Sequence, residues 1–390
     1  HDQIFSAATN YTGILLVEQN PTKKAYTFKY RKGFSDAGCQ SESTKLISAP
    51  WVFSSAIDQN ILDKLSSCAI LSDVAKITEG IVTGLNDLYL KNREEMAHLK
   101  LEPSFFHPCL RGRMIDRYFL REGEEFVFYP YRLNNGRTVP ITETELRKTA
   151  PNTVRYLNQH LDEINSRDYF TNSSKSWFEL WNQRDLALLT APKIVTPELS
   201  DRNRFTFAES NLFFGDTVCG IALKHADDNQ FTKTKCLLGI LNSTAVEWLY
   251  KRTTVPKANG FFIYKVMFLK SIPLPSVEDI HSAAIAQLVN FLLFLSMRQA
   301  LIQTDQSTRD PLMLAYFEQI LNGLVYELYF PDEVHEAGLH LFDAVAKAKL
   351  PAIETIPEED RLPRLRTLFE TLYDGTHPLR IALAKLQTLD

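Results

Sequence analysis

Arginine, lysine and asparagine side chains gather in three segments of this 390-residue chain, at residues 111–117, 201–204 and 251–260. Arginine and lysine can neutralise phosphate groups, and arginine and asparagine can form paired hydrogen bonds with base edges in the major groove. The candidate residues are Arg111, Arg113, Arg117, Arg202, Asn203, Arg204, Lys251, Arg252, Lys257 and Asn259. Together they predict binding to double-stranded DNA, although a solvated loop without a ligand is the alternative for each residue taken singly.

The segment 251–260 has the strongest physical case of the three. It joins a predicted apolar helix to a predicted strand, so both of its ends are held while its tip is free. Pro256 restricts the loop and lowers the entropy lost on binding, and Gly260 allows a sharp backbone turn. We therefore expect Lys251, Arg252 and Lys257 to contact phosphates and Asn259 to read a base.

No catalytic, cofactor-binding or metal-binding constellation is expected in this chain. Its five cysteines are scattered without a Cys-x-x-Cys pair, which argues against a disulfide framework and against a zinc site. No glycine-rich turn that could bind S-adenosylmethionine follows a predicted strand. The acidic run at 122–125 lacks the lysine partner of a metal-dependent nuclease centre. The chain by itself is predicted to be non-catalytic.

The elements that must position these loops indicate a mixed α+β fold. Alternating and β-branched runs predict strands at 13–19, 25–31, 125–131, 193–197, 204–208, 218–223 and 261–266. Helical periodicity occurs within 50–79, over 143–167 with an interruption at Pro151, over 235–251, and then over 279–302, 310–330 and 361–388 with a break at Gly375. Residues 33–49 are small and polar and are predicted to be a linker.

Charge is distributed unevenly along the chain. The formal net charge is −4, yet residues 84–275 carry 26 basic and 22 acidic side chains, whereas residues 276–390 carry 9 basic and 17 acidic ones. The excess of positive charge in the middle is modest and does not by itself establish nucleic-acid binding. No signal peptide is recognised, so a cytoplasmic location is expected. The apolar stretch 283–297 is short and contains Gln287 and Asn290, which favours a buried helix over a membrane span.

Three short motifs occur in an informative order. Residues 192–198 read Pro-Lys-Ile-Val-Thr-Pro-Glu, residues 238–243 read Leu-Gly-Ile-Leu-Asn-Ser, and residues 270–275 read Lys-Ser-Ile-Pro-Leu-Pro. This ordered set resembles the TaqI-like specificity domain of adenine-specific DNA methyltransferases and type IIG restriction–modification enzymes. The resemblance implies a domain that recognises a DNA sequence.

The resemblance extends over most of residues 50–335. Residues 80–87, 110–118, 151–180 and 325–330 are similar to further segments of those enzymes. Residues 4–17 resemble a late strand of their catalytic domain, while the Asn-Pro-Pro-Tyr/Phe motif that holds the adenine is absent. The resemblance therefore implies a parent enzyme whose N-terminal catalytic domain uses S-adenosylmethionine to methylate adenine. It leaves open whether that parent also has an endonuclease domain.

The sequence predicts three regions. Residues 1–49 would be the edge of the methyltransferase domain plus a linker, residues 50–275 the target-recognition domain, and residues 276–390 a helical C-terminal region. The leading function is sequence-specific DNA recognition for a restriction–modification enzyme. The alternative is a protein-interaction module of a multi-subunit DNA-defence complex, in which the acidic helical region contacts other subunits and DNA contact is slight.

Overall fold

The computed structural model describes residues 27–30, 39–42, 56–65, 67–167, 173–225, 227–301 and 309–389. Helices and several small sheets, most of them antiparallel, make up this part of the chain, which confirms the predicted α+β class. The predicted strand at 13–19 lies outside the described residues. Of the strand predicted at 25–31, β1 (Thr27–Tyr30) is described, and it pairs in antiparallel fashion with β2 (Cys39–Glu42). The predicted linker 33–49 therefore contains a strand.

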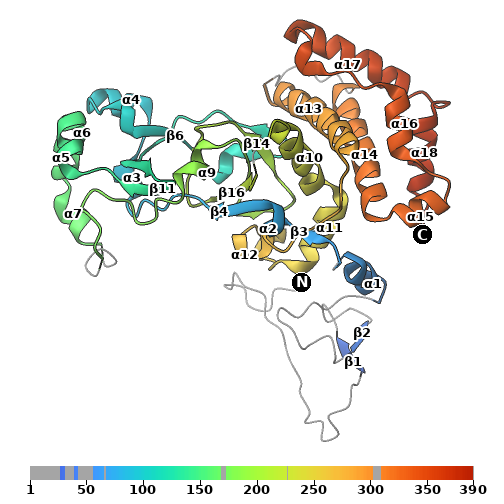
Figure 1. The fold of residues 1–390 in the computed structure, drawn as a ribbon, viewed down its shortest axis with the longest axis horizontal. Helices are drawn as coiled ribbons and strands as arrows, with labels where there is room; N and C mark the ends of the chain where they lie inside the picture. Colours follow the sequence, from blue (N-terminus) through green and yellow to red (C-terminus); the bar gives the residue numbers. More distant parts are fainter. Residues whose placement is uncertain are drawn as a thin grey trace, which may run out of the picture.

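A four-stranded antiparallel sheet occupies the middle of the molecule (Figure 1). Its strand order is β14 (Thr206–Ala208), β12 (Lys193–Pro197), β16 (Val218–Leu223) and β4 (Ala75–Glu79). Side chains alternate between its two faces, as the pleat requires. Ile194 and its partner Ile221 face one hydrophobic core, whereas Val195 and Val218 face another. Because both faces are covered, the two inner strands β12 and β16 are buried along nearly their whole length.

A second sheet and a group of short helices form the lobe at the left of Figure 1. Its strand order is β15 (Phe213–Phe214), β6 (Phe106–Leu110), β9 (Phe126–Phe128) and β5 (Leu90–Lys91). The surrounding helices are α3 (Asn86–Tyr89), α4 (Arg93–His98), α5 (Glu143–Thr149), α6 (Pro151–Asn158), α7 (Leu161–Asn165) and α9 (Leu186–Thr190). The predicted interruption at Pro151 is confirmed. Glu102 accepts hydrogen bonds from the backbone N–H groups of Asn152 and Thr153, and so caps the N-terminus of α6.

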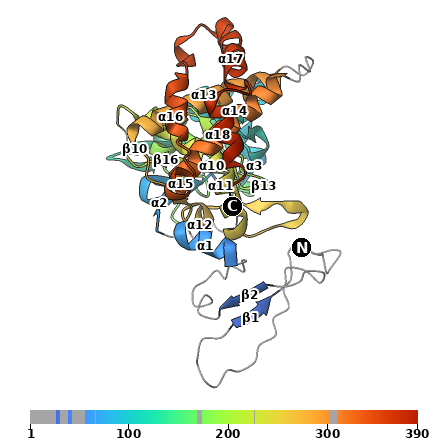
Figure 2. The same cartoon turned by 90° about the vertical axis from the view of Figure 1, so that its right-hand side faces the viewer.

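The C-terminal region is helical, as predicted. It contains α13 (Asp279–Leu301), α14 (Arg309–Tyr329), α15 (Pro331–Glu336), α16 (Leu341–Ala348), α17 (Glu358–Leu372) and α18 (Pro378–Leu386). Helices α15 and α16 are two short helices that periodicity did not identify. In both ribbon views α16, α17 and α18 lie against α13 and α14 (Figures 1 and 2).

The helical region and the central sheet share one core. Helix α10 (Gln230–Asn242) packs on the sheet and on α13, and a Cβ atom at Gly239 would lie within about 3 Å of Ile285, Val289 and Leu321. Glycine at this position permits the close approach of the helices. Residues 276–390 are therefore not a separately cored unit, and the predicted boundary after residue 275 divides one core.

Helix α13 is long and apolar enough, by length and composition, to cross a membrane. It is nevertheless mostly buried within the protein, and its apolar side chains pack against α10 and α14. The prediction of a buried helix is confirmed. The argument that the apolar stretch 283–297 is too short to span a membrane was wrong, because the helix that contains it has 23 residues.

The helix predicted over 235–251 is two helices. The chain breaks at Ser243, whose side chain accepts a hydrogen bond from the Val246 N–H and caps α11 (Thr244–Thr253). The strands predicted at 193–197 and 218–223 are confirmed. The strand predicted at 204–208 is shorter in the structure, where it is β14, and the one predicted at 261–266 is β17 (Phe262–Ile263).

Candidate nucleic-acid interface

The three predicted basic segments meet at one end of the central sheet. The Gly112 N–H donates to the Thr217 hydroxyl over 3.0 Å, which places the 111–117 segment beside the start of β16. Strand β13 (Leu199–Ser200), just before the 201–204 loop, pairs with β17 at the end of the 251–260 segment. Segments far apart in the sequence therefore form one continuous loop surface.

Asp116 lies at the centre of a cluster of arginines. Its carboxylate oxygens are 3.9, 3.8 and 3.9 Å from guanidinium nitrogens of Arg121, Arg202 and Arg204 respectively. We call these four residues the Asp116 cluster. The side chains of Arg121 and Arg202 are 65% and 51% exposed, so both can reach a ligand in solvent.

The Asp116 cluster has a net positive charge even when its nearest acidic neighbour is included. Arg204 also pairs with Asp201 at 2.8 Å. Burial would raise the pKa of Asp201, but Arg204 and Arg202 lower it below its usual value, so this carboxylate stays ionised at neutral pH. Three guanidinium groups thus face two carboxylates. A guanidinium has five N–H donors, so these arginines retain donors for a phosphate oxygen.

The sequence argument overlooked Arg121. This residue follows a tight hairpin of β7 (Ile115–Asp116) and β8 (Phe119–Leu120), in which Tyr118 has a φ of 58°. The hairpin returns the chain so that the Arg121 N–H donates to the Met114 carbonyl. The available signal was a short hairpin with Asp116 just before its turn and Arg121 just after its second strand.

Arg111 and Arg113 lie next to this hairpin and share one acidic partner. Arg113 is 73% exposed and pairs with Glu125. Arg111 is mostly covered, lying 3.9 Å from Glu125 and 3.4 Å from Asp216. Arg113 can therefore reach solvent, whereas Arg111 holds together the loops around Glu125 and Asp216.

Arg117 is the first predicted contact that the structure corrects. Its side chain is only 13% exposed and lies 2.8 Å from Glu318 of α14 and 3.5 Å from Glu247 of α11. Burial alone would lower the pKa of Arg117, but Tyr118 and the two carboxylates outweigh it and raise that pKa. We call Arg117, Glu247 and Glu318 the Arg117 network. It holds the hairpin against the helical region and leaves little of the guanidinium exposed to solvent.

Asn203 is the second correction, because its side chain is fully buried. Its amide donates to the Leu241 carbonyl over 2.7 Å and accepts from the Tyr264 hydroxyl over 2.8 Å. The neighbouring Phe205 backbone forms two hydrogen bonds with the Asn242 side chain. Asn203 and Asn242 therefore fix the loop that carries Arg202 and Arg204 on the end of α10, and Asn203 does not face a base.

The 251–260 segment is only partly available to a ligand. Arg252 lies 3.3 Å from Asp58 of α1 (Ala56–Leu65) and stacks on the Trp248 ring, which corrects its prediction as a free phosphate contact. Lys251 pairs with Glu247 at 2.6 Å. Lys257 is half-buried, and its backbone N–H donates to the Phe261 carbonyl over 2.7 Å. Asn259 is exposed at the tip in the left-handed backbone region, with a φ of 61°, and is the base-reading candidate that this segment retains.

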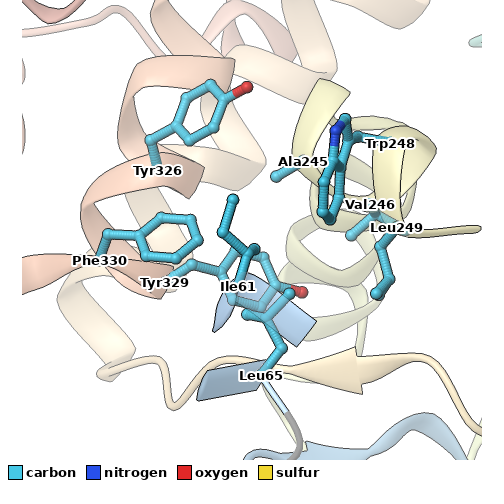
Figure 3. A pocket seen from close by; sticks show the side chains of 9 residues that line it. All are labelled: Ile61, Leu65, Ala245, Val246, Trp248, Leu249, Tyr326, Tyr329 and Phe330. Atoms are coloured by element: carbon cyan, nitrogen blue, oxygen red, sulfur yellow. The ribbon is translucent and has the colours of Figure 1, made fainter. Parts of the chain in front are cut away.

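An apolar pocket of about 140 Å³ lies between α1, α11 and α14 (Figure 3). It is lined by Ile61, Leu65, Ala245, Val246, Trp248, Leu249, Tyr326, Tyr329 and Phe330. The Tyr329 hydroxyl already donates to the Pro273 carbonyl over 2.7 Å. No carboxylate, histidine, lysine or thiol lines this pocket.

The buried cysteines are equally unsuited to chemistry. Burial raises the pKa of Cys109 and Cys219 to about 12 and that of Cys236 to about 11. A thiol rather than a thiolate is therefore present at neutral pH, and the thiol is a poor nucleophile and metal ligand.

Parts of this chain are similar to known proteins. A model of the TaqI-like C-terminal specificity domain matches residues 107–274. The chain is 22% identical over 260 residues to the type II methyltransferase M.BanIII of Aneurinibacillus aneurinilyticus, an alignment that covers 63% of this chain and 42% of the relative. It is 24% identical over 233 residues to the type II methyltransferase M.MjaIV of Methanocaldococcus jannaschii, covering 58% of this chain and 73% of the relative. The chain thus matches less than half of M.BanIII.

Among solved structures, the chain is similar to the type IIL restriction–modification enzyme MmeI, determined in complex with DNA. The TM-score is 0.46 with 13% identity, over 78% of this chain and 36% of that enzyme. The matched range 107–274 includes the hairpin, the arginine loop and the central strands β12, β14 and β16, while β4 precedes it. Residues 107–274 are therefore similar to the TaqI-like C-terminal specificity domain, within a chain similar to type II methyltransferases.

Proposed function

We propose that this chain recognises a sequence in double-stranded DNA on behalf of a type II restriction–modification methyltransferase. The observation that carries the proposal is the Asp116 cluster, in which three arginines from two separate segments converge within the range that matches the specificity domain. Arg121, Arg202 and Arg204 would grip phosphates, with Arg113 and Lys257 beside them. Asn259 at the exposed loop tip would read a base edge.

The rest of the proposed enzyme is a catalytic region N-terminal to these residues in the same protein. There S-adenosylmethionine would supply a methyl group to an adenine flipped out of the duplex. The chain described here would position the duplex and bind no cofactor of its own. Its similarity to two proteins named as type II methyltransferases supports this division of labour. Such an enzyme acts on genomic DNA and would be cytoplasmic.

A titration of duplex DNA against the chain at several salt concentrations tests the proposal. Each phosphate neutralised by an arginine or lysine releases counterions, so log Kd should change with log salt by roughly 0.9 per contact. We expect a slope that corresponds to several contacts and loss of binding as salt rises. A flat slope, or no binding even at low salt, would contradict DNA recognition by this surface.

The acidic helical region supports a second candidate function. Residues 276–390 carry 17 acidic and 9 basic side chains, a balance that repels DNA. A protein-interaction module of a multi-subunit defence complex would use this region to contact basic partner surfaces. Absence of DNA binding in the salt titration, with the fold intact, would favour this second function.

A further inference from the structure

Three side chains of metal-ligand type meet where α14, α15 and α16 join, at the lower right of Figure 1. They are Glu327 near the end of α14, His335 in α15, and His340 immediately before α16. One ligand atom of each lies within 4.8 Å of the others. The three residues come from consecutive elements and form a compact corner, independent of the proposed DNA surface.

The Glu327 carboxylate is fixed in orientation by the fold. It is buried, and its Oε2 accepts hydrogen bonds from the backbone N–H groups of Leu341 and Phe342, over 2.7 and 3.0 Å. These two donors belong to the first turn of α16, so Glu327 caps that helix. Its second oxygen, Oε1, is turned toward the two histidines and lies 2.9 Å from the His335 Nε2 atom. Outer hydrogen bonds of this kind orient carboxylate ligands in metal sites.

The two imidazoles lie on the solvent side of the carboxylate. The His335 and His340 rings stack with their centroids 4.7 Å apart, and both residues are exposed. Two ligand atoms that share a tetrahedral zinc ion at 2.0–2.1 Å are separated by roughly 3.3 Å. The Glu327–His335 pair is already close to that separation. A change of side-chain rotamer at the exposed His340 would be enough to bring in the third ligand.

We propose that Glu327, His335 and His340 bind a zinc-class divalent ion, with water completing a tetrahedral site. Two imidazoles and one carboxylate suit Zn²⁺, whereas Mg²⁺ and Ca²⁺ prefer ligand sets made wholly of oxygen. The ion holds together the ends of α14, α15 and α16. Its role is structural, because its three protein ligands belong to three consecutive elements that the ion would hold together. The proposal departs from the sequence-based expectation of no metal ligands, which rested on the absence of paired cysteines.

Zinc binding to a chain without an affinity tag tests this proposal directly. After treatment with a chelator, the protein is titrated with Zn²⁺ by calorimetry, and its thermal unfolding is followed with and without the ion. We expect one equivalent to bind and to raise the midpoint of unfolding. The double variant His335→Gln, His340→Gln should weaken binding by roughly ten- to hundredfold or more and remove the thermal shift. His98→Gln, an exposed histidine on α4, is the matched control.

A structural role of Glu327 without a metal predicts a different pattern. In that case Glu327→Gln would destabilise the protein, but Zn²⁺ would not stabilise the parent chain beyond what it does for the double histidine variant. Equal zinc affinity in the parent chain and the double variant would overturn the proposal. The double variant leaves the Glu327 bonds to α16 in place, so it is expected to fold and the comparison remains interpretable.

Discussion

Two neighbouring residues of one hairpin, Asp116 and Arg117, belong to regions of opposite character. The Asp116 cluster is exposed at the loop surface and carries more positive than negative charge. The Arg117 network is largely buried, with one arginine facing two carboxylates. Asp116 ends β7 and Arg117 begins the turn after it. The Asp116 side chain lies among the loop arginines, whereas the Arg117 side chain contacts α11 and α14.

The comparison shows that residue type does not identify a DNA contact. Arg117, Arg202 and Arg204 were equivalent candidates in the sequence. In the structure, Arg117 contributes to stability, while Arg202 and Arg204 remain available to a ligand. Lys193 is a third case, because it is buried, pairs with no carboxylate among the residues that the structure describes, and donates to the carbonyls of Glu209 and Leu212.

The largest expected effect is on stability, at Arg117. Arg117→Ala removes the partner of Glu318 and one of the two partners of Glu247 in a largely buried site, and we expect a loss of about 3 kcal/mol in the free energy of unfolding. Denaturation with urea measures this loss. Arg113→Ala removes a comparable but exposed arginine and should cost well under about 1 kcal/mol. Equal losses in the two variants would mean that burial does not distinguish the two regions.

Lys193 should make stability depend on pH in the alkaline range. Burial lowers the pKa of Lys193 from 10.5 to about 8 in the folded protein. Between these values the unfolded chain binds a proton that the folded chain does not, so raising the pH stabilises the folded state. Relative to Lys193→Met, the parent chain should gain up to roughly 3 kcal/mol from below pH 8 to above pH 10.5. Parallel pH profiles for the two proteins would refute this assignment.

The Asp116 cluster should control the salt dependence of DNA binding. In the chain with Arg121, Arg202 and Arg204 all changed to alanine, the slope of log Kd against log salt should fall by roughly 0.9 for each lost phosphate contact. Arg155→Ala, an exposed arginine on α6 in the other lobe, should leave the slope unchanged. Asp116→Asn should tighten binding at low salt, because it removes the carboxylate that competes for the guanidinium groups. An unchanged slope in the triple variant would exclude this cluster from the interface.

The smallest effect is expected at Asn259, confined to one base pair. Because its φ is 61°, Asn259→Gly removes the amide without straining the backbone, whereas alanine would add strain. Discrimination at one position should relax by about 1–3 kcal/mol, with the salt slope preserved. Binding measured against duplexes varied one base pair at a time tests this. Asn135→Gly, at another exposed turn with a φ of 48°, is the matched control and should change no preference.

The local pattern predicted the elements better than their lengths. The apolar and β-branched runs at 193–197 and 218–223 predicted these strands correctly, since β12 and β16 are buried on both faces of the central sheet. The break at Ser243 was missed because apolar residues continue on both sides of it, and only the capping hydrogen bond ends one helix and begins the next. The short helices α15 and α16 were missed because each is too short for periodicity to be recognised.

The sequence by itself determined the fold class, the helical C-terminal region and the similarity to a specificity domain, because these depend on patterns and motifs that neighbouring residues create together. The tertiary structure decided which polar side chains are free. The Asn203 side chain forms hydrogen bonds with Leu241 and Tyr264, and Arg117 forms ion pairs with Glu247 and Glu318. These partners lie about 40 to 200 positions away in the sequence. Arg121 joins Arg202 and Arg204 only because separate loops meet at one end of the sheet. Burial and long-range pairing arise from packing, and no local pattern of residues encodes them.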